Sequence, residues 1–176
     1  SPGYKAIAKQ KDTLIQGILV KKKGSSITSI SDLQDKNLAF PAPKAFAATL
    51  LTTAGLKEAE VDIKPTFVSS HDSVYLNVAK GLFPSGGGIV RTLNNLESDV
   101  RDQLEILWRT PKYTPHAFAA HPNLSKAQRD KITKSFVNLQ NSETGRQLLK
   151  SIRFKGIEEA SDGHWDDVRN LNIMIK

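Results

Sequence analysis

Two serines and a histidine stand together where a predicted strand gives way to a predicted helix: Ser69, Ser70 and His71. The apolar run before them ends at Val68, and the helical pattern after them ends at Gly81. A second apolar strand follows through Gly86–Gly88, and a strand–helix–strand unit of this length favours a parallel crossover. Such a crossover places the start of the helix, with its unpaired N–H groups and positive dipole end, at the carboxyl edge of the sheet. We therefore expect these polar residues to hold a small oxyanion.

Simpler structural roles exist for the same residues. Ser70 is a good N-cap whether or not it touches a ligand. A histidine at a helix start keeps a lowered pKa unless an anion lies nearby, so His71 can donate to a ligand oxygen or cap the helix. Consecutive Ser70, His71 and Asp72 are not a hydrolase triad, because adjacent residues cannot place three side chains in relay. We expect Tyr75 in the core, and we expect Gly86–Gly88 to permit close backbone approach at a cleft.

Apolar runs and capping residues predict an alternation of strands and helices that positions this edge. We expect strands at 14–20, 37–40, 63–68, 86–90, 104–108 and 116–120. We expect helices at 45–53, 70–80 and 164–173, a helix through Leu93 and Leu96, and helices that start at two capping boxes, Ser31 with Gln34 and Ser125 with Gln128. Alternation of this kind predicts an α/β fold with a mainly parallel sheet.

Composition restricts the chemistry that the chain can perform. It has 176 residues, no cysteine and a formal net charge of +7. The lack of cysteine excludes a disulfide scaffold and a thiol nucleophile, and His116 with His121 has no nearby carboxylate to complete a metal set. The basic residues are scattered among acids and do not alternate with aromatics, so we expect a surface that attracts small anions and no nucleic-acid partner. No apolar run is long enough to cross a bilayer.

Three segments follow one another in a familiar order: YKAIAKQKDTLIQGILVKKKGSSITSISDLQDKNLAFPAPKAFAATLL, SSHDSVYLNVAKGLF and LWRTPKYTPHAFAAHPNLS. This order resembles the substrate-binding component of phosphonate ABC transporters, in the phosphate, phosphite and phosphonate branch of the type 2 periplasmic binding proteins. The resemblance implies two α/β lobes with mainly parallel sheets, joined by two crossover strands and closing on ligand. Residues 37–111 would form the second lobe, and 1–36 with 112–176 the first. Family members have a further segment ahead of the position of Ser1, so we expect an incomplete first lobe and a chain that is a piece of a longer protein.

The resemblance also implies further ligand contacts. Family members grip the phosphonyl group with hydroxyls and backbone N–H groups at the start of a second-lobe helix, which here is the turn that contains Lys44 and Ala45. The usual hydroxyls are absent from this turn, so backbone N–H groups and the charge of Lys44 would hold the anion. The alternative is an alanine-rich helix that only packs on the sheet. Ser70 and His71 match the next family contact, and Tyr4 would supply an aromatic hydroxyl from the first lobe.

Arg91 and His116 depart from the family pattern. Members that recognise an amino-alkyl phosphonate place a carboxylate at each of these positions, where it holds the ammonium group. A guanidinium and an imidazole would repel a cationic ligand tail. Arg91 can instead clamp a carboxylate or phosphonate in bidentate fashion, or form a surface ion pair with Glu97 or Asp99.

Together these inferences favour a solute-binding protein that is not an enzyme and needs no cofactor. It would bind phosphonate, phosphite or phosphate in an interlobe cleft and deliver it to an ABC permease. We expect a monomer in the periplasm or anchored to the outer face of the cytoplasmic membrane. The alternative is an extracytoplasmic sensing domain of a membrane receptor such as a histidine kinase. An enzyme on this fold would need a nucleophile, metal or cofactor lysine, and a transcription-factor effector domain would need a helix-turn-helix segment upstream.

Overall fold

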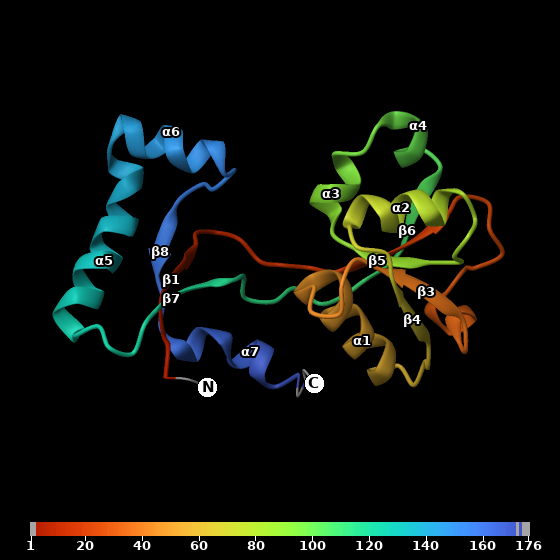
Figure 1. Ribbon diagram of the computed structural model, residues 1–176, viewed down its shortest axis with the longest axis horizontal. Coiled ribbons are helices and arrows are strands. Elements are labelled where there is room, and N and C mark those ends of the chain that lie inside the picture. The colour runs from red at the N-terminus through yellow and green to blue at the C-terminus, as the bar shows by residue number, and fades with distance from the viewer. Residues whose placement is uncertain (1–2, 172, 174–176) are drawn as a thin grey trace. The chain divides into compact units, whose positions relative to one another are not determined.

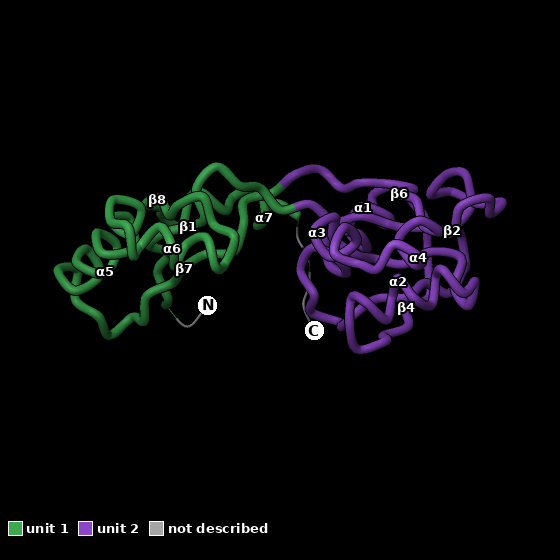
Figure 2. Tube along the Cα trace, turned by 90° about the horizontal axis from the view of Figure 1, so that it is seen from above, with its two compact units in different colours: residues 1–15, 113–172 green, residues 16–112, 173–176 purple. Residues whose placement is uncertain are grey.

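Two hydrogen-bonded sheets organise the chain, each within its own compact unit (Figures 1 and 2). The computed structural model describes residues 3–171 and 173. Of the described residues, unit 1 takes those up to 15 and those from 113 to 171, and unit 2 takes 16–112 and 173. The unit boundary thus lies at residue 15, whereas a lobe boundary was predicted at residue 36. The difference arises because the strand that begins at Ile18 pairs with two strands of unit 2.

The sheet of unit 2 is mixed, with strand order β4-β3-β5-β2-β6. Its strands are β2 (Ile18–Lys22), β3 (Asn37–Phe40), β4 (Lys64–Phe67), β5 (Gly86–Gly88) and β6 (Leu104–Arg109). β4 and β5 both run parallel to β3, so the crossover predicted between them is indeed parallel, with β3 lying between its two strands. β2 runs antiparallel to both of its neighbours, β5 and β6.

The prediction of mainly parallel sheets is therefore wrong. In unit 2, β2 runs antiparallel to both of the strands beside it. In unit 1, the strand order is β7-β1-β8, and both pairs of neighbours are antiparallel. The strands of unit 1 are β1 (Lys5–Gln10), β7 (Ala117–Ala120) and β8 (Ile157–Glu159). An apolar run indicates that a strand is buried but carries no information about its direction. The sequence pattern therefore could not distinguish parallel from antiparallel pairing.

Helices cover both faces of the sheet in unit 2. They are η1 (Ile30–Leu33), the π-helical turn η2 (Phe46–Leu51), α1 (Thr52–Glu58), α2 (His71–Ala79), α3 (Val90–Asn94) and α4 (Ser98–Arg101). Alternate residues of β2 belong to the two resulting cores: Ile18 and Val20 pack with Tyr75 and Val78 of α2, and Leu19 packs with Leu56 of α1. η1 begins with a capping box of Ser29 and Asp32, two residues ahead of the Ser31–Gln34 box that the sequence predicted.

The helices of unit 1 are α5 (Lys126–Asn138), η3 (Leu139–Asn141), α6 (Glu143–Ser151), η4 (Asp162–Trp165) and α7 (Asp166–Arg169). The capping box of Ser125 and Gln128 that opens α5 confirms the sequence prediction. The helix predicted at 164–173 is replaced by η4 and α7, and residue 172 lies outside the described residues. None of the described helices combines the length and the apolar character that crossing a membrane requires.

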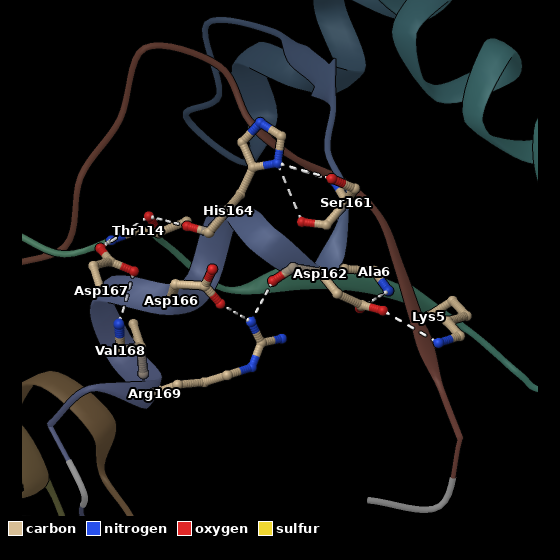
Figure 3. Close-up of polar contacts among 10 residues, drawn as sticks. All are labelled: Lys5, Ala6, Thr114, Ser161, Asp162, His164, Asp166, Asp167, Val168 and Arg169. Carbon is tan, nitrogen blue, oxygen red and sulfur yellow. Dashed lines mark hydrogen bonds and ion pairs between the residues drawn. The ribbon is translucent and has the colours of Figure 1, made fainter.

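Side-chain hydrogen bonds fasten η4 and α7 to the segment that leads into β7 (Figure 3). Asp167 Oδ2 accepts from the backbone N–H of Thr114 at 2.7 Å, and the carbonyl of His164 accepts from the Thr114 hydroxyl at 2.8 Å. The indole N–H of Trp165 donates to the carbonyl of Pro115 at 2.6 Å. On the other side of η4, Asp162 accepts from the backbone N–H of Ala6 at 2.9 Å.

Candidate functional site

Two helices of unit 2 start at the same edge of the sheet. β3 and β4 are parallel with Phe40 opposite Phe67, and the backbone N–H of Val68 donates to the carbonyl of Phe40 at 2.9 Å. β3 leads into η2, and β4 leads into α2. The first turns of both helices therefore follow strand ends that lie side by side, which is the position where α/β sheets bind small anions.

Ser70 is the N-cap of α2, as predicted. Its side chain accepts from the backbone N–H of Ser73 at 3.0 Å and donates to the Ser73 hydroxyl at 2.9 Å. Ser69, just ahead of it, has a φ of +73°, a left-handed conformation that costs a non-glycine residue energy. In the described part of the chain, no acceptor pairs with the backbone N–H groups of His71 and Asp72. These two groups are available to an anion at the start of the helix.

His71 occupies the first position of α2. Its Nδ1 is buried and has no hydrogen-bond partner among the described residues. Burial lowers the pKa of His71 below its usual value of 6.5, although the Asp72 carboxylate acts in the opposite direction. The ring is therefore neutral at neutral pH. A buried N–H without an acceptor is rare, so the buried Nδ1 favours the tautomer that carries its proton on Nε2.

Backbone packing shapes the start of η2. The Ala45 carbonyl accepts from the N–H groups of both Thr49 and Leu50, at 2.8 and 3.1 Å, which widens this turn to a π-helix. Ala47 and Ala48 are buried, and their carbonyls lie so close to the backbone that a Cβ on Gly17 or Gly87 would overlap them. The alanine-rich helix thus packs on the sheet, as the alternative reading held. Its N–H groups at 47 and 48 nevertheless have no acceptor among the described residues. Packing and anion binding are compatible here.

A third loop at the same edge connects β5 to α3. Tyr75, in the core as predicted, reaches this loop with its hydroxyl, which donates to the Ile89 carbonyl at 2.8 Å and accepts from the Ile89 N–H at 2.9 Å. Arg91 lies on α3 with an exposed side chain. Among the described residues it forms no ion pair with Glu97 or Asp99, the alternative role that the sequence left open. Its charge is therefore available at the surface of α3.

The predicted site residues divide between the two units. Six of them lie at or just before the three helix starts described above in unit 2: Lys44, Ala45, Ser69, Ser70, His71 and Arg91. The other two belong to unit 1. The Tyr4 ring packs edge-on against His121 at a centroid distance of 5.2 Å, and His116 is an exposed residue just before β7. Ligand contact by any of these eight residues stays a prediction.

The close backbone approach predicted at Gly86–Gly88 is present, since a Cβ on Gly87 would overlap the Ala48 carbonyl, but it serves packing in the buried sheet. A Cβ on Gly86 would meet Val74 at 2.5 Å, and a Cβ on Gly88 would overlap the Tyr75 hydroxyl. Sequence reasoning missed that Tyr75 joins α2 to the loop before α3. Its spacing of four residues from His71 was the signal, because residues i and i+4 share one helix face. No cluster of three or more His, Asp or Glu side chains in the described residues is placed to hold a metal ion.

Comparison with known proteins gives a consistent result. Over residues 1–165, the sequence matches the family described as the periplasmic substrate-binding protein of phosphonate ABC transporters. A binding protein component of an ABC phosphonate transporter from Pseudomonas aeruginosa shares 17% identity and a TM-score of 0.76, covering 96% of this chain and 61% of its own. PhnD1 from Prochlorococcus marinus, solved with methylphosphonate, shares 20% identity and a TM-score of 0.79, covering 97% of this chain and 71% of its own.

A third solved structure has a similar fold. XAC2383 from Xanthomonas citri, bound to a chloride ion, shares 14% identity and a TM-score of 0.85, covering 96% of this chain and 69% of its own. These likenesses show an α/β fold of the type 2 periplasmic binding protein kind. The chain spans 61–71% of the length of the three proteins.

Proposed function

This chain belongs to the family of periplasmic substrate-binding proteins of phosphonate ABC transporters, and we propose that it binds a small phosphorus oxyanion at the edge of the unit 2 sheet. The family is one of transport proteins and not of enzymes. One observation carries the proposal: the first turns of η2 and α2 follow adjacent parallel strands, and both leave backbone N–H groups without an acceptor in the described residues. Phosphonate, phosphite and phosphate all present several oxygens to such donors.

The donors at this edge are mostly neutral. The backbone N–H groups at 47, 48, 71 and 72 would bind oxygens of the anion, and a neutral His71 would donate from Nε2. Lys44, exposed ahead of η2, adds positive charge, and the two helix dipoles add to it. Ser69 and Ser70 would complete the loop around the ligand. Ligand contact by Tyr4 and His116 of unit 1 stays a prediction.

Arg91 suggests which ligands the protein prefers. A guanidinium in the first turn of α3 disfavours a ligand with an ammonium tail and favours one with a second anionic group. We therefore expect a phosphonate that carries a carboxylate, or a plain phosphorus oxyanion, to bind better than 2-aminoethylphosphonate.

A transport role follows from the family, and its details are proposals. The protein would work as a monomer in the periplasm, or anchored to the outer face of the cytoplasmic membrane, and would deliver its ligand to an ABC permease. It would need no cofactor and would bind no nucleic acid. The second candidate is a sensing domain of a membrane receptor such as a histidine kinase, which would bind the same ligand and pass a signal to a kinase in place of a permease.

A thermal-shift screen tests the binding proposal. Phosphate, phosphite, methylphosphonate, phosphonoacetate, 2-aminoethylphosphonate and sulfate would each be added to the protein, because a ligand that binds only the folded state raises the melting temperature. We expect a selective rise with one or more phosphorus oxyanions and none with sulfate. His71→Ala should weaken binding by roughly 1–3 kcal/mol, the usual cost of losing a hydrogen bond to a charged group. Absence of a shift with every phosphorus compound would contradict the proposal.

A further inference from the structure

The hydroxyl of Tyr75 sits inside the core of unit 2 with several hydrogen bonds. The Tyr75 side chain is fully buried, at 0% exposure. Its hydroxyl lies 2.8 Å from the Ile89 carbonyl, 2.9 Å from the Ile89 nitrogen and 2.9 Å from the Thr92 hydroxyl. The Thr92 hydroxyl also lies 3.0 Å from the Ile89 carbonyl, so the three groups form a closed network. A fully satisfied buried network of this kind holds its members in one arrangement.

The missing side chain of Gly88 leaves room for the Tyr75 hydroxyl. A Cβ on Gly88 would overlap the Tyr75 oxygen, so only glycine lets the hydroxyl reach the backbone of the β5–α3 loop. Burial raises the pKa of Tyr75 above 10, and the hydroxyl therefore remains a neutral donor and acceptor at every physiological pH. The Tyr75 oxygen is thus held by close packing against Gly88 of β5 and by its hydrogen bonds to Ile89.

Two candidate ligand residues lie on the two sides of this network. His71 is four residues before Tyr75 in α2, and residues so spaced share one helix face. On the other side, Ile89 and Thr92 bracket Arg91 along the chain. A bond between Tyr75 and these two residues therefore ties the turn that carries Arg91 to the helix that begins with His71.

We propose that Tyr75 is a positioning residue that holds Arg91 at a fixed place relative to the start of α2. The inference rests on the proposed function, since it assumes that a phosphorus oxyanion binds at this start. The network would matter most for a ligand that reaches both places, with a phosphonyl group at the start of α2 and a second anionic group at Arg91. It would matter little for a ligand too small to reach Arg91. The oxygen of Tyr75 itself touches no ligand, because it is buried.

Titration calorimetry with two probes tests this role. Phosphonoacetate carries a second anionic group, and methylphosphonate does not. Tyr75→Phe keeps the ring and removes the oxygen, so we expect it to fold and to weaken phosphonoacetate binding about tenfold, a size typical of residues that share a network. Methylphosphonate binding should change by less than about threefold. Gly88→Ala, which displaces the same hydroxyl from the strand side, should give the same pattern.

A double-mutant cycle separates positioning from stability. If Tyr75 acts through Arg91, then Arg91→Ala should weaken phosphonoacetate binding in the wild-type background and have almost no effect in the Tyr75→Phe background. Losses that multiply independently, or a Tyr75→Phe variant that binds both probes like the wild type, would overturn the inference and leave the proposed function standing. A wild-type protein that binds phosphate or phosphite but neither probe would overturn the inference alone, and one that binds no phosphorus oxyanion at all would overturn the proposed function with it.

Discussion

Asp167 accepts hydrogen bonds from both the backbone N–H and the hydroxyl of Thr114, at 2.7 and 3.0 Å. The two residues are 53 positions apart, so the bonds connect α7 to the segment where the chain re-enters unit 1. Trp165 reinforces the connection through its bond to the next residue, Pro115. The C-terminal helices of unit 1 are therefore held by specific side-chain acceptors and not only by apolar contact (Figure 3).

Asp167→Ala should destabilise unit 1. The substitution leaves the Thr114 N–H without its acceptor, at a cost of about 0.5–1.5 kcal/mol, as is usual for a hydrogen bond in a folded protein. Urea unfolding followed by tryptophan fluorescence would report it, because Trp165 lies in the same segment. Asp166→Ala is the matched control: Asp166 pairs with Arg169 on the same exposed helix turn and makes a contact of the kind that contributes little. An equal fall in the free energy of unfolding of the two variants would mean that the bonds to Thr114 stabilise unit 1 no more than the surface ion pair does.

Gly87→Ala should be far more damaging. A Cβ at this position would overlap the Ala48 carbonyl and lie 2.5 Å from the Phe40 ring, both in the tightly packed interior of unit 2. Overpacking of this kind costs roughly 1–3 kcal/mol or more. Gly163→Ala is the control, since the nearest atom to a Cβ there is an Asp166 oxygen 4.0 Å away. Thermal unfolding of the two variants should show a large fall in melting temperature for Gly87→Ala alone. A normal melting temperature in both would show that η2 can move off the sheet at little cost.

Local signals in the sequence predicted local structure well. Ser70 and Gly81 bound α2 as expected, because an N-cap hydroxyl and a glycine with a φ of +75° each satisfy the backbone at a helix end. The capping box at Ser125 was equally reliable. Strand direction and unit membership were not predictable in this way. The apolar residues of β2 are compatible with either direction, and only its partners, β5 and β6, decide that it runs antiparallel in unit 2.

The site was predictable as a set of positions but not as an arrangement. Residue types and the strand–helix junctions placed His71 and Arg91 near the carboxyl ends of strands at one sheet edge, and the structure puts both in the first turns of helices that follow those strand ends. The link between them was not predictable, because it depends on the Tyr75 hydroxyl reaching across to Ile89 over a glycine. The same three-dimensional packing explains why Gly86–Gly88 serves the core, although the pattern indicated a cleft.

The pH dependence of stability should carry a contribution from His71. Burial depresses the pKa of this residue in the folded protein, so below about pH 6.5 the unfolded chain takes up a proton more readily than the folded one. His71 therefore contributes fully to stability above that pH, and the contribution is lost as the pH falls through the folded-state pKa. Urea unfolding at pH 7.5 and 5.0 should show a smaller loss of stability on acidification in His71→Gln than in the wild type. An identical loss in both proteins would show that protonation of His71 is not coupled to folding.

Charge reversal at Arg91 should change ligand preference. Arg91→Glu replaces an exposed guanidinium in the first turn of α3 with a carboxylate, which attracts an ammonium group and repels a second anion. We expect the variant to gain affinity for 2-aminoethylphosphonate and to lose affinity for phosphonoacetate, with methylphosphonate changing least. Lys80→Glu makes the same change of charge at an exposed residue at the other end of α2, so it separates a local effect from a general change in net charge. Calorimetric titration of both variants with all three compounds would measure these changes in affinity. If the two variants shift preference alike, or Arg91→Glu shifts nothing, then Arg91 does not face the ligand.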